Sequence, residues 1–284
     1  MKHLNLSAFA AAAATALAIV PSADAAFPGR NGSIALERFE AGNPKGTAVL
    51  AVNTKGAQQA RIGDGSFPAW SSTGRWIAFS TGGITIAKSN GSSSRLVVRD
   101  GYDPSWAPNG KTLVFTRDLE ADESAGFATL FRVNTDGTGL KQLVQGRSPS
   151  WSPKGDKIAY ASEDTLWLVQ ADGKRRERIY RVGPYIVDLD WAPDARALLV
   201  VRQVPGTRDT REIQRVTSSG RKLGTLVRAK GITGAAYSPD GRSIVYSTGT
   251  TSEPTKRVLT RTMSGGKTTT VGQGSRPTWA PAGR

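Results

Sequence analysis

The sequence contains no cysteine, and its single histidine is His3. The missing cysteine excludes disulfide bonds and a thiol nucleophile. The absence of histidine after position 3 excludes a Ser-His-Asp triad and the usual ligand sets of zinc, copper and haem from the rest of the chain. Only carboxylate, lysine, tyrosine or serine side chains remain for catalysis. The composition therefore favours a protein that is not an enzyme and that needs no cofactor.

Long apolar runs are also scarce, and the one present lies at the N-terminus. Residues 4–20 carry no charge, follow a basic start at Lys2 and end at Pro21. The small-x-small pattern Ala23-Asp24-Ala25 then predicts a secretory signal peptide over residues 1–25, cleaved after Ala25. An uncleaved anchor helix is the alternative, although 17 residues are short for a bilayer.

The signal peptide predicts an extracytoplasmic protein, secreted or held in the periplasm or cell envelope, with no membrane span after cleavage. Residues 26–284 are long enough to bury a core without disulfide bonds, and we expect them to form one domain and a monomer. The formal net charge is +15, from 38 Lys and Arg against 23 Asp and Glu. A basic surface attracts polyanions, which for an exported protein means envelope polymers more than nucleic acid. The alternative is that the basic composition serves solubility alone.

An aromatic residue followed by a tight turn and an apolar strand recurs along the chain. The seven marker residues are Phe27, Trp70, Trp106, Trp151, Trp191, Tyr237 and Trp279. Their spacings are 43, 36, 45, 40, 46 and 42 residues, which define six units. A repeat of this length indicates a propeller or a solenoid.

Each unit predicts four strands. In one copy, Trp151 is followed by the turn 152–155, where proline sets φ and glycine takes a positive φ, and then by an apolar run at 157–160. A third strand at 166–169 ends in the turn Asp172-Gly173. The fourth strands are polar and basic, which suits an outer edge facing water. Four antiparallel strands repeated six times predict the blades of a β-propeller, whereas a β-solenoid has shorter rungs without paired hairpins.

The two ends of the chain predict closure of the ring. Residues 277–279 form a first strand with no strands after it, and residues 32–65 supply the other three strands of a blade. The predicted fold is therefore an all-β, six-bladed β-propeller of four-stranded antiparallel blades, closed by the C-terminal strand joining the N-terminal blade. Phe27 duplicates the position of Trp279 and is expected to lie outside that strand.

The repeat resembles that of the TolB-like, WD-repeat-related β-propeller family. Its best copies are residues 148–155 (SPSWSPKG) and 132–137 (RVNTDG), and the resemblance covers essentially all of the chain after Ala25. It implies a propeller that binds protein partners, but the motif residues form turns and packing contacts and say little about function. The chain leaves no room between Ala25 and Phe27 for the extra N-terminal domain of TolB. It also lacks the histidines on which enzymatic relatives of the family depend.

Propellers commonly bind ligands at the mouth formed by loops entering the first strand of each blade. Residues three or four positions before each marker should point there, and Tyr185 belongs to the same loop as Asp188. The candidate ligand-binding residues are Tyr102, Asp103, Arg147, Tyr185, Asp188 and Arg276. Two arginines and two aspartates at one mouth could bind a polar ligand, or they could pair with one another and hold the blades in register.

Three further segments carry clustered charge. Residues 117–123 are acidic and could bind Ca²⁺, but they lack the glycine and spacing of an EF-hand loop, which favours a solvated loop. Arg202, Arg208 and Arg211 surround Pro205-Gly206 and would suit an anionic partner. Residues 174–178 are basic and are expected on an exposed outer strand. The aspartates assigned to capping of turns are Asp136, Asp156, Asp172, Asp194 and Asp240.

Three functions are compatible with this sequence. The favoured one is a non-catalytic exported propeller that acts as a scaffold for a protein partner or an anionic envelope polymer. The second is a carboxylate-only hydrolase or lyase that acts on a polysaccharide with Asp103 and Asp188. Nearby arginines argue against this function, because they are expected to keep both carboxyls ionised. The third is an extracellular polyanion binder.

Overall fold

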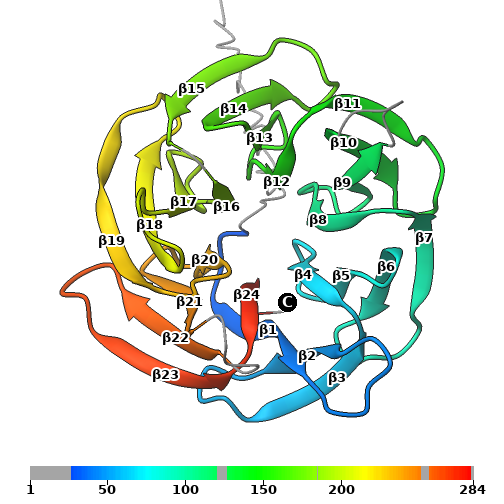
Figure 1. The fold of residues 1–284 in the computed structure, drawn as a ribbon. Helices are drawn as coiled ribbons and strands as arrows, with labels where there is room; N and C mark the ends of the chain where they lie inside the picture. Colours follow the sequence, from blue (N-terminus) through cyan, green and yellow to red (C-terminus); the bar gives the residue numbers. More distant parts are fainter. Residues whose placement is uncertain (1–26, 120–126, 184, 251–255, 283–284) are drawn as a thin grey trace, which may run out of the picture.

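The computed structural model describes residues 27–119, 127–183, 185–250 and 256–282. These residues form 24 β-strands in six four-stranded antiparallel sheets, which are arranged as a ring around a central axis (Figure 1). The prediction of a six-bladed propeller is confirmed. No helix within the described ranges has the length and apolar character needed to cross a bilayer. The predicted signal peptide lies outside the described residues.

The blades are numbered from the N-terminus, and each is given from its innermost strand outward. Blade 1 contains β24 (Ser275–Pro281), β1 (Asn31–Phe39), β2 (Thr47–Val52) and β3 (Gln58–Asp64). Blade 2 contains β4 (Ser66–Trp70), β5 (Trp76–Ser80), β6 (Gly83–Lys88) and β7 (Arg95–Arg99). Blade 3 contains β8 (Tyr102–Trp106), β9 (Thr112–Leu119), β10 (Phe127–Asn134) and β11 (Lys141–Gln145).

The other three blades follow the same order. Blade 4 contains β12 (Arg147–Trp151), β13 (Lys157–Ser162), β14 (Thr165–Gln170) and β15 (Glu177–Arg181). Blade 5 contains β16 (Ile186–Trp191), β17 (Ala197–Gln203), β18 (Thr210–Thr217) and β19 (Lys222–Lys230). Blade 6 contains β20 (Ala235–Tyr237), β21 (Ser243–Thr248), β22 (Arg257–Thr262) and β23 (Thr268–Gln273).

Closure of the ring occurs in blade 1, as the sequence predicts. The C-terminal strand β24 pairs with β1 in antiparallel register, with Trp279 opposite Ile34 and Thr278 opposite Ala35. The innermost position of blade 1 is therefore taken by Trp279, and Phe27 lies outside the strand. Figure 1 shows the two ends of the propeller side by side in this blade.

Apolar side chains fill the space between neighbouring blades. One such layer joins Leu166 and Leu168 of blade 4 to Trp191 and Leu198 of blade 5. Marker tryptophans also fasten adjacent first strands, because Trp106 Nε1 donates to the Ala69 carbonyl (3.0 Å) and Trp191 Nε1 to the Ser150 carbonyl (3.1 Å). The aromatic repeat thus sets the packing and the spacing of the blades.

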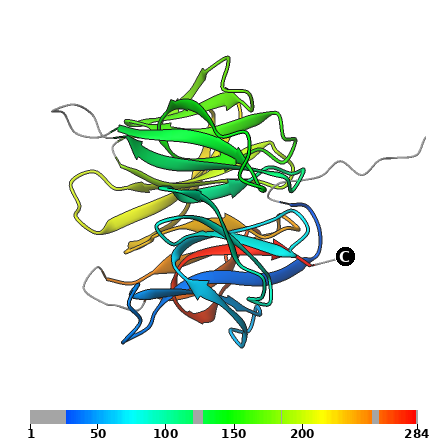
Figure 2. The ribbon, with the colours of Figure 1, turned by 90° about the vertical axis from the view of Figure 1, so that its right-hand side faces the viewer.

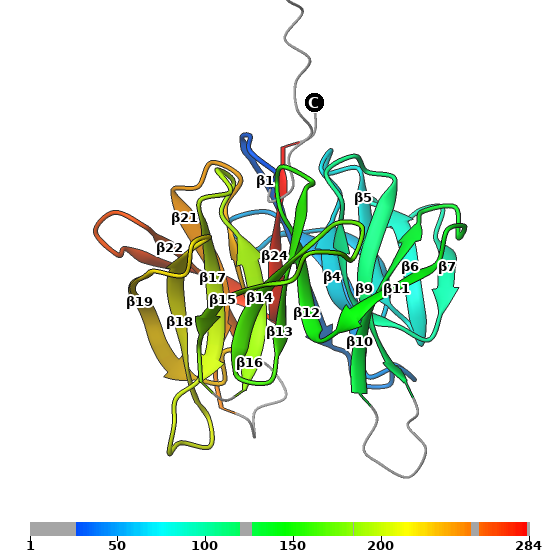
Figure 3. The same ribbon diagram turned by 90° about the horizontal axis from the view of Figure 1, so that it is seen from above.

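The ring has two distinct faces, seen edge-on in Figures 2 and 3. One face, here called the loop side, carries the connections into the first strands. A glycine shortly before a first strand there donates to the preceding blade near the start of its third strand, as in Gly146 N to Ala128 O (2.8 Å) and Gly231 N to Asp209 O (3.0 Å). On the hairpin side, the two hairpin turns of one blade meet, as in Ala171 N to Asp156 O (2.9 Å). This arrangement confirms that the loops predicted to form the mouth share one face.

Candidate functional site at the loop-side mouth

A cavity of about 120 Å³ lies on the axis of the ring, between the first strands of the blades. The charged residues that line it are Asp103, Asp188, Asp190 and Arg276. Of the six candidates named from the sequence, the structure therefore brings three together, namely Asp103, Asp188 and Arg276. Proteins usually bind polar ligands in concave sites with a few convergent polar groups, which is the character of this channel.

A repeated backbone distortion occurs at the mouth in four of the blades, and Asp103 and Arg276 are among the residues that carry it. Phe67, Asp103, Ser148 and Arg276 each stand three residues before a marker, and each has a positive φ of 56°, 56°, 51° and 44°. The register of the first and second strands shifts at the same place in each of these blades. A left-handed conformation costs a residue with a side chain about 1–2 kcal/mol. Strained backbone is common at functional sites, and here it recurs at the equivalent mouth position of four blades.

Asp188 and Asp190 connect blade 5 to blade 6. Asp188 Oδ2 accepts a hydrogen bond from Ala235 N (2.9 Å), and Asp190 Oδ2 accepts one from Tyr237 N (2.8 Å). Gly234 makes the first contact possible, because a Cβ at this position would lie only 2.9 Å from Asp188 Oδ2. Both carboxylates are thus held by backbone groups and not by arginine.

Burial raises the pKa values of these aspartates. The pKa of Asp103 rises to about 6, because burial outweighs the nearby Arg276 charge and a hydrogen bond from Ser148. The pKa of Asp188 rises to about 7 through burial and the neighbouring Asp103 carboxylate, against the effects of Ala235 N and Arg276. Burial also raises the pKa of Asp190. These pKa values run counter to the expectation that arginines keep Asp103 and Asp188 fully ionised, because one guanidinium does not offset the loss of hydration.

Arg276 is committed to a cluster that joins blades 1 and 2. Its Nε lies 3.2 Å from Glu37 Oε1, and its guanidinium carbon lies 4.0 Å from the centre of the Phe67 ring. Glu37 is 5% exposed and also accepts hydrogen bonds from Phe67 N (2.6 Å) and Ser275 Oγ (3.1 Å). Sequence reasoning missed Glu37. The available signal was a charged residue directly after the apolar strand 34–36, where the other repeats place small or uncharged residues.

The other three candidates lie outside the cavity lining. Tyr102 donates to Asp118 Oδ1 (2.9 Å) and packs against Phe67, with ring centres 5.7 Å apart. Arg147 is exposed. Tyr185 is 62% exposed and has a φ of 60°. A ligand role for these residues stays a prediction.

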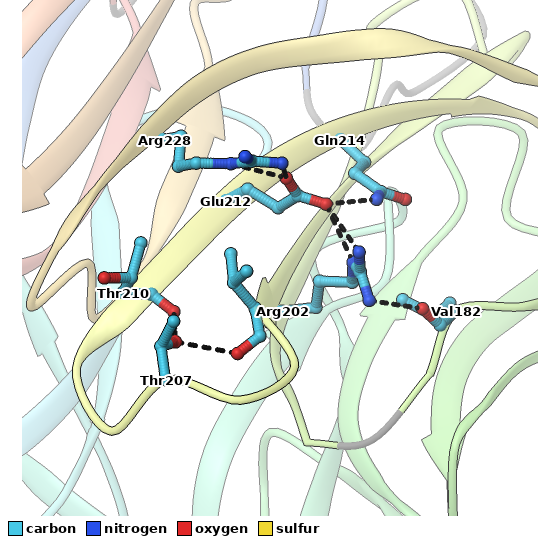
Figure 4. Close-up of polar contacts among 8 residues, drawn as sticks. Val182, Arg202, Thr207, Thr210, Glu212, Gln214 and Arg228 are labelled. Atoms are coloured by element: carbon cyan, nitrogen blue, oxygen red, sulfur yellow. Dashed lines mark hydrogen bonds and ion pairs between the residues drawn. The ribbon is translucent and has the colours of Figure 1, made fainter.

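Most of the arginine segment 202–211 is also occupied by contacts within the protein (Figure 4). Arg202 and Arg228 both pair with Glu212, at 2.7 Å each, and Arg202 Nη1 donates to the Val182 carbonyl (3.0 Å). Gln214 Nε2 donates to the same carboxylate (2.6 Å). Burial by itself raises the pKa of Glu212, but these three donors lower it to about 2. Arg202 is therefore unsuited to the anionic partner expected from the sequence.

Arg211 is likewise engaged, since its Nη1 donates to the Ile232 carbonyl (2.5 Å). The carboxylates of the acidic segment at Glu120, Asp122 and Glu123 lie outside the described residues. Among the described residues, no group of three or more acidic, histidine or cysteine side chains is placed to hold a metal ion. The aspartates predicted to cap turns do so at Asp136, Asp172, Asp194 and Asp240, each accepting the backbone N–H two residues later. Asp156 instead accepts a hydrogen bond from Ser152 Oγ (2.6 Å).

Comparisons with known sequences give short matches. No protein-family model matches the chain. It is 28% identical to dipeptidyl-peptidase 5 of Porphyromonas endodontalis over 147 residues, which cover 50% of the chain and 15% of that protein. It is 31% identical to the Tol-Pal system protein TolB of Francisella tularensis subsp. holarctica over 81 residues, which cover 27% of the chain and 19% of that protein. The matches thus span less than a fifth of either relative.

Comparisons with solved structures extend over more of the chain. TolB from Acinetobacter baumannii superposes with a TM-score of 0.73 at 16% identity, over 88% of this chain and 67% of that one. An oligogalacturonate lyase in complex with manganese superposes with a TM-score of 0.56 at 16% identity, over 80% of this chain and 71% of that one. Identities this low show a shared fold and leave the activity open.

Proposed function

Because the chain has the fold of a TolB-like β-propeller, we propose that it is a non-catalytic, extracytoplasmic scaffold whose loop-side mouth binds a protein partner. The observation that carries the proposal is the axial cavity, which is lined by Asp103, Asp188 and Arg276 from three separate blades, two of them (Asp103 and Arg276) in a left-handed backbone conformation. The extracytoplasmic location rests on the predicted signal peptide and on the likeness to TolB proteins.

The charges of the mouth indicate what kind of group the partner contributes. Three aspartates and one arginine line the cavity, and that arginine is already paired with Glu37. The mouth therefore favours a segment that brings hydrogen-bond donors or a positive charge. An anionic envelope polymer would have to bind the basic outer surface instead, because the acidic lining repels it.

The test is capture of partners from an envelope extract by the immobilised protein. We expect a partner that is retained by the wild type and by Arg221→Ala, whose exposed side chain lies in the hairpin turn between β18 and β19, and that is lost with Asp188→Asn and with Asp103→Asn. Circular dichroism melting curves of each variant verify folding. Equal capture by all four proteins would place the interaction elsewhere and refute a binding role for the mouth.

A second candidate function is a carboxylate-only hydrolase or lyase acting on a polysaccharide. It is favoured by pKa values of about 6 for Asp103 and about 7 for Asp188 in one cavity. At neutral pH such a pair can hold one proton, as acid–base catalysis requires. The likeness to oligogalacturonate lyase is a likeness of fold only.

This candidate is tested by incubating the protein with a panel of polysaccharides, oligogalacturonides among them. New reducing ends or an ultraviolet absorbance from an unsaturated product would reveal cleavage. If the candidate holds, turnover follows a bell-shaped pH dependence and is abolished by Asp103→Asn or Asp188→Asn. If the wild type cleaves none of the polysaccharides in the panel, the proposed hydrolase or lyase function is refuted.

A further inference from the structure

Phe27 lies at the end of the channel opposite the loop-side mouth. Its side chain is 7% exposed and belongs to the apolar cluster that contains Trp106, Phe115 and Ala78. It also lines the same cavity as Asp103 and Asp188. Figure 1 shows the first described residues, in dark blue, running from the centre of the ring out to β1.

The seat of Phe27 is aromatic and is built from the repeat itself. Five aromatic markers line the cavity, namely Trp70, Trp106, Trp151, Tyr237 and Trp279. The first four are the last residues of their first strands, and Trp279 stands two residues before the end of β24. Pro239, in the hairpin turn of blade 6, completes the lining. Trp106 belongs to the same apolar cluster as Phe27, so this end of the channel suits a phenyl group because it buries the apolar area of the ring.

Residues 27–30, which place Phe27 in the channel, are held by few hydrogen bonds. Gly29 N donates to the Pro239 carbonyl (3.1 Å), and Ala282 N donates to the Arg30 carbonyl (2.6 Å). Asn31 and Asp240 exchange two further hydrogen bonds, of 3.1 and 3.2 Å. Residues 27–30 precede β1 and take no part in a strand ladder. A segment with so few contacts opens at a lower free energy than the blades do.

We propose that the hairpin-side opening of the channel is a receptor for an aromatic side chain on an extended peptide, and that Phe27 occupies it in cis as a plug. Release of residues 27–30 frees the seat for an aromatic residue of another peptide and opens the channel from end to end. The plug and the mouth line one cavity, so occupation of either end alters the other. By thermodynamic linkage the effect is reciprocal. The proposal does not depend on what binds at the mouth.

The first experiment compares Phe27→Ala with Phe39→Ala, a matched control in which the ring removed is 48% exposed. Thermal melts are recorded with and without millimolar toluene, since an apolar cavity of about 150 Å³ is large enough for benzene. We expect Phe27→Ala to lower Tm by several degrees and toluene to restore part of it. Phe39→Ala and the wild type should show little response. Equal melting of the two variants, or equal toluene effects on all three proteins, would overturn the proposal.

The second experiment tests the receptor in trans with an acetylated, amidated peptide of residues 26–30, AFPGR. Isothermal titration should show binding to Phe27→Ala at least tenfold tighter than to the wild type, and no binding of the peptide in which alanine replaces the phenylalanine. If Phe27→Ala does not fold, Phe27→Leu serves in its place, with a smaller vacated seat and a smaller affinity ratio. Binding that does not require the phenylalanine, or the same affinity for variant and wild type, would show that residues 27–30 are only a structural segment.

Discussion

The carboxylates in two sheltered regions of this propeller have pKa values that are shifted in opposite directions. Asp103 and Asp188 at the mouth have pKa values of about 6 and 7, whereas Glu212 in blade 5 has a pKa of about 2. Burial opposes ionisation in both places. The difference lies in the donors, because Glu212 receives two guanidinium groups and an amide, while Asp188 receives two backbone N–H groups and faces a second carboxylate.

The comparison separates a region organised for stability from one that retains unfavourable features. The Glu212 cluster ties β17, β18 and β19 of one blade together with satisfied charges. The mouth combines left-handed residues, crowded carboxylates and a single cation. Sites that bind or react are commonly held in such costly arrangements by a rigid surrounding fold.

Of the substitutions that test the difference between the Glu212 cluster and the mouth, Glu212→Gln is expected to have the largest effect on stability. Neutralising a carboxylate that is 1% exposed leaves Arg202 without its counter-charge in a sheltered site. We expect a loss of about 3 kcal/mol in the free energy of unfolding, measured by urea denaturation at pH 7. The control is Glu177→Gln, because Glu177 pairs with Lys157 at 3.4 Å on the surface. That exposed pair should contribute less than about 0.5 kcal/mol, and similar losses in the two variants would contradict the distinction.

The fold could be predicted almost completely from the sequence, while the site could be predicted only in part. Each marker aromatic and each turn glycine has a local role, so the spacing alone indicates six blades and their closure by residues 277–279. The placement of Asp103 and Arg276 in the cavity lining goes with a register shift between the first and second strands of their blades, which no residue type in the sequence marks. The burial that raises the pKa of Asp188 and the seating of Phe27 likewise arise from residues far apart in the chain.

A smaller effect of opposite sign is expected from Asp188→Asn. A carboxyl with a pKa of about 7 in the folded protein and about 3.9 in the unfolded chain takes up a proton on folding between these values. Stability from this group is therefore present at low pH and is lost as pH rises from about 4 to about 7. The difference between the two pKa values sets an upper limit of about 4 kcal/mol on the gain in stability of the variant at pH 8. Solvent screening at this half-buried position and the two backbone N–H donors, which an amide cannot both satisfy, reduce the expected gain to about 1–2 kcal/mol at pH 8, and most of that gain should be absent at pH 4.5. Urea denaturation at the two pH values measures the difference, and a variant that is less stable at pH 8 would contradict the assignment.

The smallest effect is expected at Arg276, where two substitutions separate charge from stacking. Arg276→Lys keeps the positive charge but loses the planar contact with Phe67, which should cost about 0.5–1 kcal/mol in urea denaturation and leave the pKa values of Asp103 and Asp188 nearly unchanged. Arg276→Gln also removes the charge, so the pKa values of both aspartates should rise further, as followed by carboxyl-carbon NMR titration. A rise with both substitutions would show that the geometry of the guanidinium matters, whereas no rise with Gln would mean that Arg276 does not act on the aspartates. In the second case the small number of cations at the mouth would no longer explain why the mouth aspartates differ from Glu212, and burial together with the Asp103–Asp188 repulsion would have to account for the difference.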